Sequence, residues 1–431
     1  MDKLTIGIFL ESYPDKQIGG GFSYYEALIE AIDQYNFHNA LDIRFISTGF
    51  ASSAPGKKKI LNIDPYRHIN KKIRYKQHFN YSILQPAKKV AKLISYLHQK
   101  LQAEFETAYT KAIEKELVRH GIDIIYYLSP QSHKFNYPYV STHWDIGHRS
   151  MFSFPEVAMN GSFADRCNYF QTTLQKAFAI YCESEAGKAE LIKYTNINED
   201  RVFVVPLFPG TVASLSVSLS GQIECLEKYG LHNRAYFFYP AQFWSHKNHY
   251  NLLLAFKELI KDHPEIKMVF TGSDRGNLEY IKKVVKELSL QNTVVMPGFV
   301  SSEEVYSFYK NALALVMPTF LGPTNMPLLE AEVLGCPVIC SNLEGHREMM
   351  GENACYVKPD DPQSILDGMI KHIEAKPTKP RNNAVFNIAN AVRQIEANFL
   401  KLKPRRKTFG VNFNQFVQIL VLYNLNNFFI I

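Results

Sequence analysis

Short apolar runs alternate with helical stretches along this chain of 431 residues, and the alternation is interrupted once. Before the interruption, buried strands are expected at residues 4–10, 43–47, 122–128, 139–142 and 178–184. A long helical stretch covers residues 87–118. Strands that alternate with helices in this way form parallel sheets covered by helices, so the pattern predicts an α/β fold.

The interruption is a stretch rich in Ser, Gly and Pro at residues 207–223, where little helical pattern is present. Further strands are then expected at residues 236–239, 267–271, 293–296, 313–317 and 337–340. The sequence therefore predicts two lobes, each with a parallel sheet, that face a central cleft. Their expected bounds are 1–206 for the first lobe, 207–233 for a linker, 234–380 for the second lobe and 381–431 for a C-terminal helix and tail.

The net charge of +7 is unevenly distributed. Residues 51–100 hold 12 Lys and Arg against the single acid Asp64, and residues 401–407 hold five basic residues and no acid. Such patches either attract phosphates or form a solvated basic face. The apolar tail at residues 408–431 either packs on the fold or lies at a membrane interface.

The six cysteines form no metal-binding or disulfide pattern, and no apolar run approaches the ~20 residues that span a bilayer. These features favour a cytoplasmic protein, with peripheral contact at the inner face of an anionic membrane as an extension of that expectation.

A glycine triplet follows the first expected strand and precedes a helix expected from about Phe22. The amides of Gly20 and Gly21 are candidates for contact with a phosphate, because glycines at such a turn let the backbone approach closely. The alternative is a plain turn. The spacing lacks the GxGxxG pattern and its following acid, which argues against a nicotinamide-dependent dehydrogenase.

Two positions in the second lobe have the chemistry of a nucleotide site. Lys247 is expected at a helix start, where a cation is disfavoured unless an anion binds there. Pro327 is well placed to begin a helix, which puts Glu330 in the first turn. A carboxylate there either accepts hydrogen bonds from a ribose diol or interacts only with the helix dipole.

The segment PTFLGPTNMPLLEAEVLGCPVICSN at residues 318–342 resembles the signature of retaining glycosyltransferase family 4, the glycosyl transferases group 1, which has the GT-B fold. Other segments fit the same family in order: the GGG loop, THWDIGH, CESEAGKAELIK, YPAQFWSHKNH, GFVSSEEVYSFYKNA, GHRE and YVKPDDPQSI. Together they cover residues 4 to 375, and the combination is highly specific.

The resemblance implies roles for individual residues. The first lobe would face the acceptor and the second would bind the donor nucleotide. Glu330 would bind the ribose, Lys247 would hold the diphosphate, and His143 would face the transferred sugar; these three are the expected catalytic residues. Glu185 matches a first-lobe position near the cleft. The expected donor-binding residues are Gly20, Gly21, Gln242, Lys247, Gly272, Gly322, Pro323, Thr324, Asn325, Met326 and Glu330.

Two positions depart from the family pattern. Gly322 stands where the family usually has a second glutamate that contacts the sugar, and Gln242 stands where it has an arginine. The loop at residues 322–325 resembles a variant of the family in which the amides and polar side chains of the loop itself take over the role of the missing glutamate.

No metal or other cofactor is expected. A metal site formed by His143, Asp145 and His148 is the disfavoured alternative, because no fourth ligand is evident.

The implied activity is transfer of a hexose from a nucleotide diphosphate sugar to a glycan acceptor with retention of configuration. A mannose-type sugar carried by GDP is favoured, in the synthesis of a surface polysaccharide or O-antigen, with a glycan or lipid-linked glycan as acceptor. No nucleic-acid partner is expected. A non-catalytic nucleotide-sugar-binding protein, a GT-B epimerase and a phosphorylase remain as alternatives.

Overall fold

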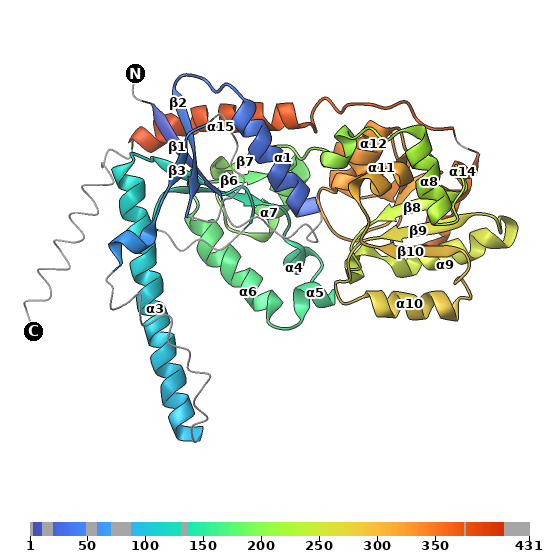
Figure 1. The fold of residues 1–431 in the computed structure, drawn as a ribbon, viewed down its shortest axis with the longest axis horizontal. Helices are drawn as coiled ribbons and strands as arrows, with labels where there is room; N and C mark the ends of the chain where they lie inside the picture. The colour runs from blue at the N-terminus through green and yellow to red at the C-terminus, as the bar shows by residue number, and fades with distance from the viewer. Residues whose placement is uncertain are drawn as a thin grey trace, which may run out of the picture. The chain divides into compact units, whose positions relative to one another are not determined.

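A computed structural model describes residues 3–10, 20–48, 58–69, 88–130, 136–374 and 376–408. Internal contacts divide the chain into two compact units. The first consists of Met1–Tyr13, Asn36–Val140 and Glu396–Ile431, and the second of Pro14–Tyr35 and Ser141–Ile395. Figure 1 shows the helices and strands, coloured from blue to red in the order in which they follow along the chain.

The first parallel sheet has seven strands in the order β3-β2-β1-β4-β5-β6-β7. Their bounds are Leu4–Leu10 for β1, Leu41–Ser47 for β2, Ile60–Asn62 for β3, Ile124–Tyr126 for β4, Tyr139–His143 for β5, Ala179–Cys182 for β6 and Val202–Val204 for β7. In β1 all seven residues are buried, as expected of a central parallel strand covered on both faces. Leu4 lies opposite Leu41, which sets the register of β1 on β2.

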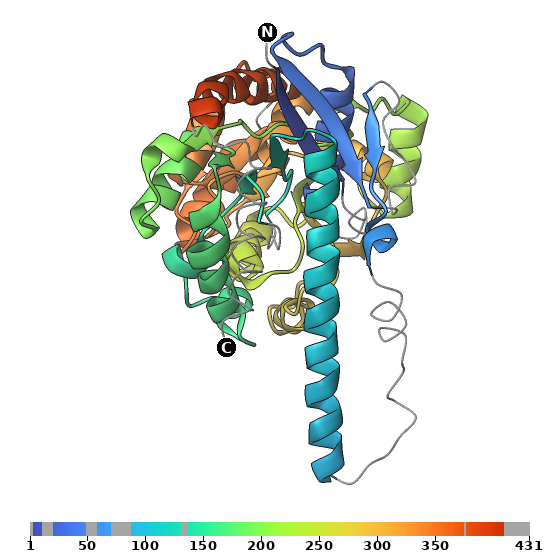
Figure 2. The same cartoon turned by 90° about the vertical axis from the view of Figure 1, so that its left-hand side faces the viewer.

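Two helices complete the first unit. The long helix α3 (Lys88–Arg119) is prominent in Figure 2, and its Phe105 and Ala112 pack with Ile69 in a small core. The C-terminal helix α15 (Ile388–Thr408) belongs to this unit from Glu396 onward. There Phe399 packs edge-on against Tyr126 of β4, with ring centroids 5.8 Å apart.

The second parallel sheet lies wholly in the second unit and has the strand order β10-β9-β8-β11-β12-β13. Its strands are Tyr236–Pro240 (β8), Lys267–Thr271 (β9), Val294–Gly298 (β10), Leu315–Met317 (β11), Val338–Ser341 (β12) and Cys355–Val357 (β13). Helix α11 (Ser302–Asn311) packs beside α8 (Leu219–Lys228) and α12 (Met326–Leu334). Helix α9 (His249–Asp262) packs beside α10 (Leu278–Glu287) and α14 (Pro362–Ile373).

The remaining helices of the second unit are short or stand near the ends of strands. They are α1 (Gly20–Gln34), α4 (Gly147–Ser150), α5 (Pro155–Ala158), α6 (Ser162–Asn168), α7 (Glu185–Tyr194) and α13 (Glu344–Met350).

The predicted α/β class with two parallel sheets is confirmed. The expectation of little helical pattern up to residue 223 is wrong from Leu219 onward, where α8 begins, because Ser218 caps this helix through the amide of Gly221. The helix expected over residues 380–400 begins only at Ile388.

The apolar tail beyond Thr408 and most of the basic stretch before α3 lie outside the described residues. Over the described part of the chain, we find no helix that combines the length and apolarity needed to cross a membrane.

Candidate functional site

A pocket of about 650 Å³ lies in the second unit, and every residue that lines it belongs to that unit. This volume is in the range of small-molecule sites. The lining comes from the first turn of α1, from segments that follow β5 and β6, and from the loops after β8, β9 and β11. The carboxyl ends of parallel strands are where α/β proteins bind ligands.

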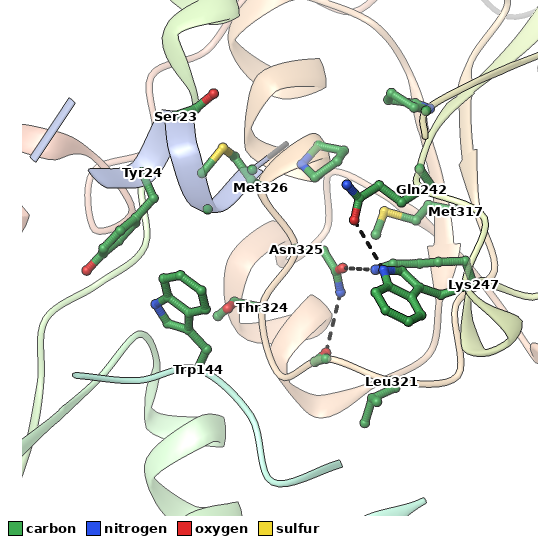
Figure 3. Close-up of a pocket in the computed structure, with 18 of the residues that line it drawn as sticks. Ser23, Tyr24, Trp144, Gln242, Lys247, Met317, Leu321, Thr324, Asn325 and Met326 are labelled. Carbon is green, nitrogen blue, oxygen red and sulfur yellow. Dashed lines mark hydrogen bonds between the residues drawn. The ribbon is translucent and has the colours of Figure 1, made fainter. Parts of the chain in front are cut away.

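The pocket brings together all of the expected donor-binding residues. They are Gly20, Gly21, Gln242, Lys247, Gly272, Gly322, Pro323, Thr324, Asn325, Met326 and Glu330. Figure 3 shows Lys247 and Asn325 pointing toward one another, with Tyr24 and Trp144 at the other side of the view. Residues that are up to about 300 positions apart in sequence therefore share one cavity.

Lys247 ends the short 3-10 turn Ser245–Lys247, just before α9. Its ammonium Nζ donates to Asn325 Oδ1 at 3.0 Å. Burial lowers the pKa of Lys247 to about 8, although Asp145 and Glu156 act in the opposite direction. An ammonium held with so little solvation would gain strongly from a bound anion.

A chain of hydrogen bonds fixes the partner of that ammonium. The imidazole Nδ1 of His346 lies 2.9 Å from the carbonyl oxygen of Ser341, so this nitrogen carries the proton. Nε2 is then an acceptor, and it lies 2.9 Å from the amide Nδ2 of Asn325. This orients the Asn325 side chain so that its oxygen faces Lys247. Burial lowers the pKa of His346 to about 4, which keeps the ring neutral and the chain intact near neutral pH.

The loop at residues 322–325 is confined by its neighbours. Gly322 has a φ of +114°, a conformation that favours glycine, so a glutamate at this position would be strained. Gly345 at the start of α13 lies against the backbone of Pro323, and a Cβ there would come within 1.5 Å of the Pro323 carbonyl oxygen. The loop is therefore held in place by close backbone packing as well as by Asn325.

Glu330 lies in α12, with Pro327 near the start of that helix as predicted. Its carboxylate accepts a hydrogen bond from the Tyr309 hydroxyl at 2.9 Å and another from the backbone N–H of Gly210. The residue is only 8% exposed, and burial raises its pKa to about 7. Ionisation of Glu330 is therefore costly unless a ligand donates hydrogen bonds to it.

This pKa predicts a pH dependence of stability that Glu330→Gln removes. The folded protein holds the proton up to about pH 7, whereas the unfolded chain releases it near 4.5, so the stabilising effect of protonation is lost as pH rises through 7. Urea unfolding at pH 5 and pH 8 should show wild type losing about 2 to 3 kcal/mol more than the variant. Equal losses in the two proteins would contradict the raised pKa.

Helix α1 begins at Gly20, two residues earlier than expected from the sequence. Gly20 and Gly21 are thus in its first turn, where backbone N–H groups lack partners within the helix. A helix N-terminus with exposed amides is suited to a phosphate group. Gly19, which completes the glycine triplet, lies outside the described residues.

Several residues of the pocket wall, among them Tyr24 and Trp144, were not predicted from the sequence. Tyr24 of α1 stacks on Phe208 at 4.9 Å and meets Trp144 edge-on at 5.8 Å. Asp145 accepts from the Gly147 amide at 2.8 Å and pairs with Arg166. Although burial opposes ionisation of Asp145, Arg166 and the Gly147 amide hold its pKa below the ordinary value. The positions of Trp144 and Asp145 in the sequence were a usable signal for the site, because both residues directly follow β5.

His143 and Glu185 are not among the lining residues. His143 is the last residue of β5, buried edge-on against Phe170 at 5.5 Å, and burial lowers its pKa to about 4. Glu185 is exposed at the start of α7, where its backbone N–H donates to Glu348 at 2.9 Å. The carboxyl group that lines the pocket from this segment is that of Glu183.

Gln242 lines the pocket together with Trp244. The indole Nε1 of Trp244 donates to Gln242 Oε1 at 3.1 Å, which fixes the side chain that replaces the family's arginine. As for a metal, the described residues contain no group of three or more His, Cys, Asp or Glu side chains placed to hold one.

Comparison with known proteins identifies a segment in the second half of the chain. Residues 224–389 match the sequence profile described as Glycosyl transferases group 1. This segment is a group 1 glycosyltransferase domain. The group 1 domain contains Gln242, Lys247, the loop at residues 322–325 and Glu330, whereas α1, Trp144 and Glu183 lie outside it.

Curated relatives are similar over part of the chain. O-antigen chain mannosyltransferase B of Escherichia coli is 25% identical over 243 residues, which is 54% of this chain and 61% of the relative. O-antigen chain mannosyltransferase RfbU of Salmonella typhimurium is 28% identical over 190 residues, or 44% of this chain and 49% of the relative. The matches thus span about half to three fifths of these relatives' lengths.

Solved structures show that the fold extends beyond the group 1 domain. Sucrose-phosphate synthase from Thermosynechococcus elongatus has a TM-score of 0.64 at 17% identity, covering 94% of this chain and 100% of that structure. Anabaena Alr3699/HepE in complex with UDP and glucose has a TM-score of 0.59 at 16% identity, covering 92% and 99%. With its two parallel sheets, the chain has the GT-B fold.

Proposed function

We propose that the protein transfers a hexose from a nucleotide diphosphate sugar to a hydroxyl group of a glycan acceptor, with retention of configuration. The observation that carries this is the convergence in one pocket of the Lys247 ammonium, the Glu330 carboxyl group and the first-turn amides of α1. These groups match the diphosphate and ribose of a nucleotide sugar in charge and hydrogen bonding.

In this mechanism the protein acts mainly through electrostatics. Breaking the bond between the sugar and the diphosphate places negative charge on the departing phosphate oxygens. Lys247 and the amides of Gly20 and Gly21 would stabilise that charge, since all three line the pocket and are preorganised. Asn325 and His346 act as positioning residues, because they orient the ammonium without carrying charge themselves.

For the donor and product we propose a GDP-linked, mannose-type sugar and a surface polysaccharide or O-antigen. Both similar curated proteins described above are named as O-antigen chain mannosyltransferases, which supports this choice. A GT-B protein that binds nucleotide sugars without transferring them, and a GT-B epimerase, are the competing functions. The replacement of the family's second glutamate by Gly322 is the feature that favours the non-catalytic function.

The test is incubation of the purified protein with GDP-mannose, UDP-glucose and ADP-glucose, first in water and then with lipid-linked oligosaccharide acceptors. We expect slow release of one nucleoside diphosphate, faster release with acceptor, and a product whose anomeric configuration by NMR equals that of the donor. Binding without release would favour the non-catalytic function. Release of an epimerised sugar would favour an epimerase, and an inverted product would contradict retention.

A further inference from the structure

A carboxyl group that the mechanism above does not use lies in the wall of the pocket. Glu183 directly follows β6 and lines the pocket, although the residue as a whole is only 7% exposed. Its backbone carbonyl accepts a hydrogen bond from the Leu207 amide at 3.0 Å, so the position of its main chain is fixed. Glutamates are rarely buried without a compensating interaction, so the burial of Glu183 requires an explanation.

Glu183 contacts the same loop that lacks the family's second glutamate. Its Oε2 accepts a hydrogen bond from the Thr324 hydroxyl at 2.7 Å, and Thr324 is two residues from Gly322. Within the described part of the chain, the other oxygen, Oε1, has no hydrogen-bond partner. One oxygen is therefore anchored to the loop while the second remains available to a ligand in the pocket.

We propose that Glu183 binds a hydroxyl group of the transferred sugar through Oε1 and so replaces the carboxyl group that is absent at position 322. The proposal rests on the proposed function and assigns part of its sugar specificity. It also explains how a chain with glycine at position 322 keeps a carboxyl group in the pocket, delivered from the first sheet instead of from the loop.

The protonation state of the Glu183 side chain determines whether Oε1 donates or accepts a hydrogen bond. Burial and, to a lesser extent, Asp145 raise the pKa of Glu183 to about 8, against the lowering effect of the Thr324 hydrogen bond. Near neutral pH the side chain thus holds a proton in the free protein. Because Oε2 already accepts from Thr324, the proton lies on Oε1, which can donate to an oxygen of the sugar.

The test pairs a side-chain deletion with the deletion of single hydroxyl groups from the donor. Rates are measured with GDP-mannose and its 2-, 3-, 4- and 6-deoxy derivatives, or with the matching UDP-glucose series where that donor is used. For wild type, one deoxy donor should lower kcat/KM by about 10- to 100-fold, the effect of one buried hydrogen bond. In Glu183→Met, that same deoxy donor should lower kcat/KM little further. The substitution of Glu183 and the missing hydroxyl group of the donor would remove the same contact.

Matched variants distinguish two roles of Glu183: a contact with the sugar, and support of the loop at residues 322–325. Thr324→Val removes the loop hydrogen bond but leaves Glu183, so it should keep the wild-type preference for the one hydroxyl. Glu185→Gln changes the exposed carboxylate two residues away and should behave as wild type. In Glu183→Met the Kd for GDP alone should stay within about twofold of wild type, because the proposal places Oε1 against the sugar and not against the nucleotide. Glu183→Ala is the second variant if the methionine variant does not fold.

Two results would overturn the proposal. The first is that Glu183→Met shows the same penalty as wild type with all four deoxy donors. The second is that Thr324→Val removes the hydroxyl preference as completely as Glu183→Met, which would make Glu183 a support for the loop. Neither result touches the proposed function, which fails if wild type transfers no sugar from any of the nucleotide sugars.

Discussion

Replacement of Lys247 by methionine should lower donor turnover by about 100- to 1000-fold, the cost of removing one preorganised charge-stabilising group. The variant keeps the aliphatic stem but leaves Asn325 Oδ1 without its ammonium donor. The diphosphate would then depart without the cation that lines its pocket.

The same variant should not be less stable than wild type. Burial lowers the pKa of Lys247 to about 8 from an ordinary 10.5, so at pH 7 the charged side chain destabilises the fold. We expect the free energy of unfolding to stay equal or rise by up to about 2 kcal/mol, since the side chain is partly exposed to the pocket. Lys286→Ala, at an exposed position of α10, is the control and should change neither quantity. Wild-type turnover in Lys247→Met would remove Lys247 from the mechanism.

The second large effect is expected at Gly345, which lies outside the pocket lining. A Cβ at this position would come within 1.5 Å of the Pro323 carbonyl oxygen and 2.5 Å of its carbon, and both are backbone atoms. Gly345→Ala must therefore displace the loop at residues 322–325 or the start of α13. Because a shift of about 1 Å in a positioning group can cost 100-fold in rate, we expect turnover to fall by about that factor.

Stability should fall in the same variant by about 1 to 3 kcal/mol, as in other overpacked sites. Gly221→Ala in α8 is the matched control, because its nearest neighbour is a Val217 side-chain atom at 3.2 Å that can move. That control should keep wild-type turnover. If Gly345→Ala did the same, the loop geometry would not matter for the reaction.

The sequence was sufficient to predict most strands of the two sheets, because those strands are largely apolar and are separated by helical stretches. β1 and β9 have the predicted bounds. The strands β3, β7 and β13 were not predicted, since three residues are too short for a periodic pattern. Helix α8 was missed because Ser and Gly at its start resemble a linker.

For the site, the family resemblance brought together Lys247, Glu330 and the loop at residues 322–325, and all of these line the pocket. It did not identify Glu183 or Trp144, which depend on where strands β6 and β5 end. It favoured Glu185, two positions from Glu183, since a helix start and a strand end cannot be distinguished to within two residues by pattern alone. The orienting chain through His346 joins residues whose proximity only the fold reveals.

The most direct test of a nucleotide-sugar site in this pocket is the melting temperature of the full chain with GDP, UDP, ADP and their common sugar conjugates. At about 100 times its Kd, a ligand that binds the folded state adds about 2.7 kcal/mol of stability, which is readily measured. We predict a clear upward shift with one nucleotide family, and a smaller shift with that ligand in Glu330→Gln. No shift with any nucleotide or nucleotide sugar would contradict the assignment of this pocket as a donor site.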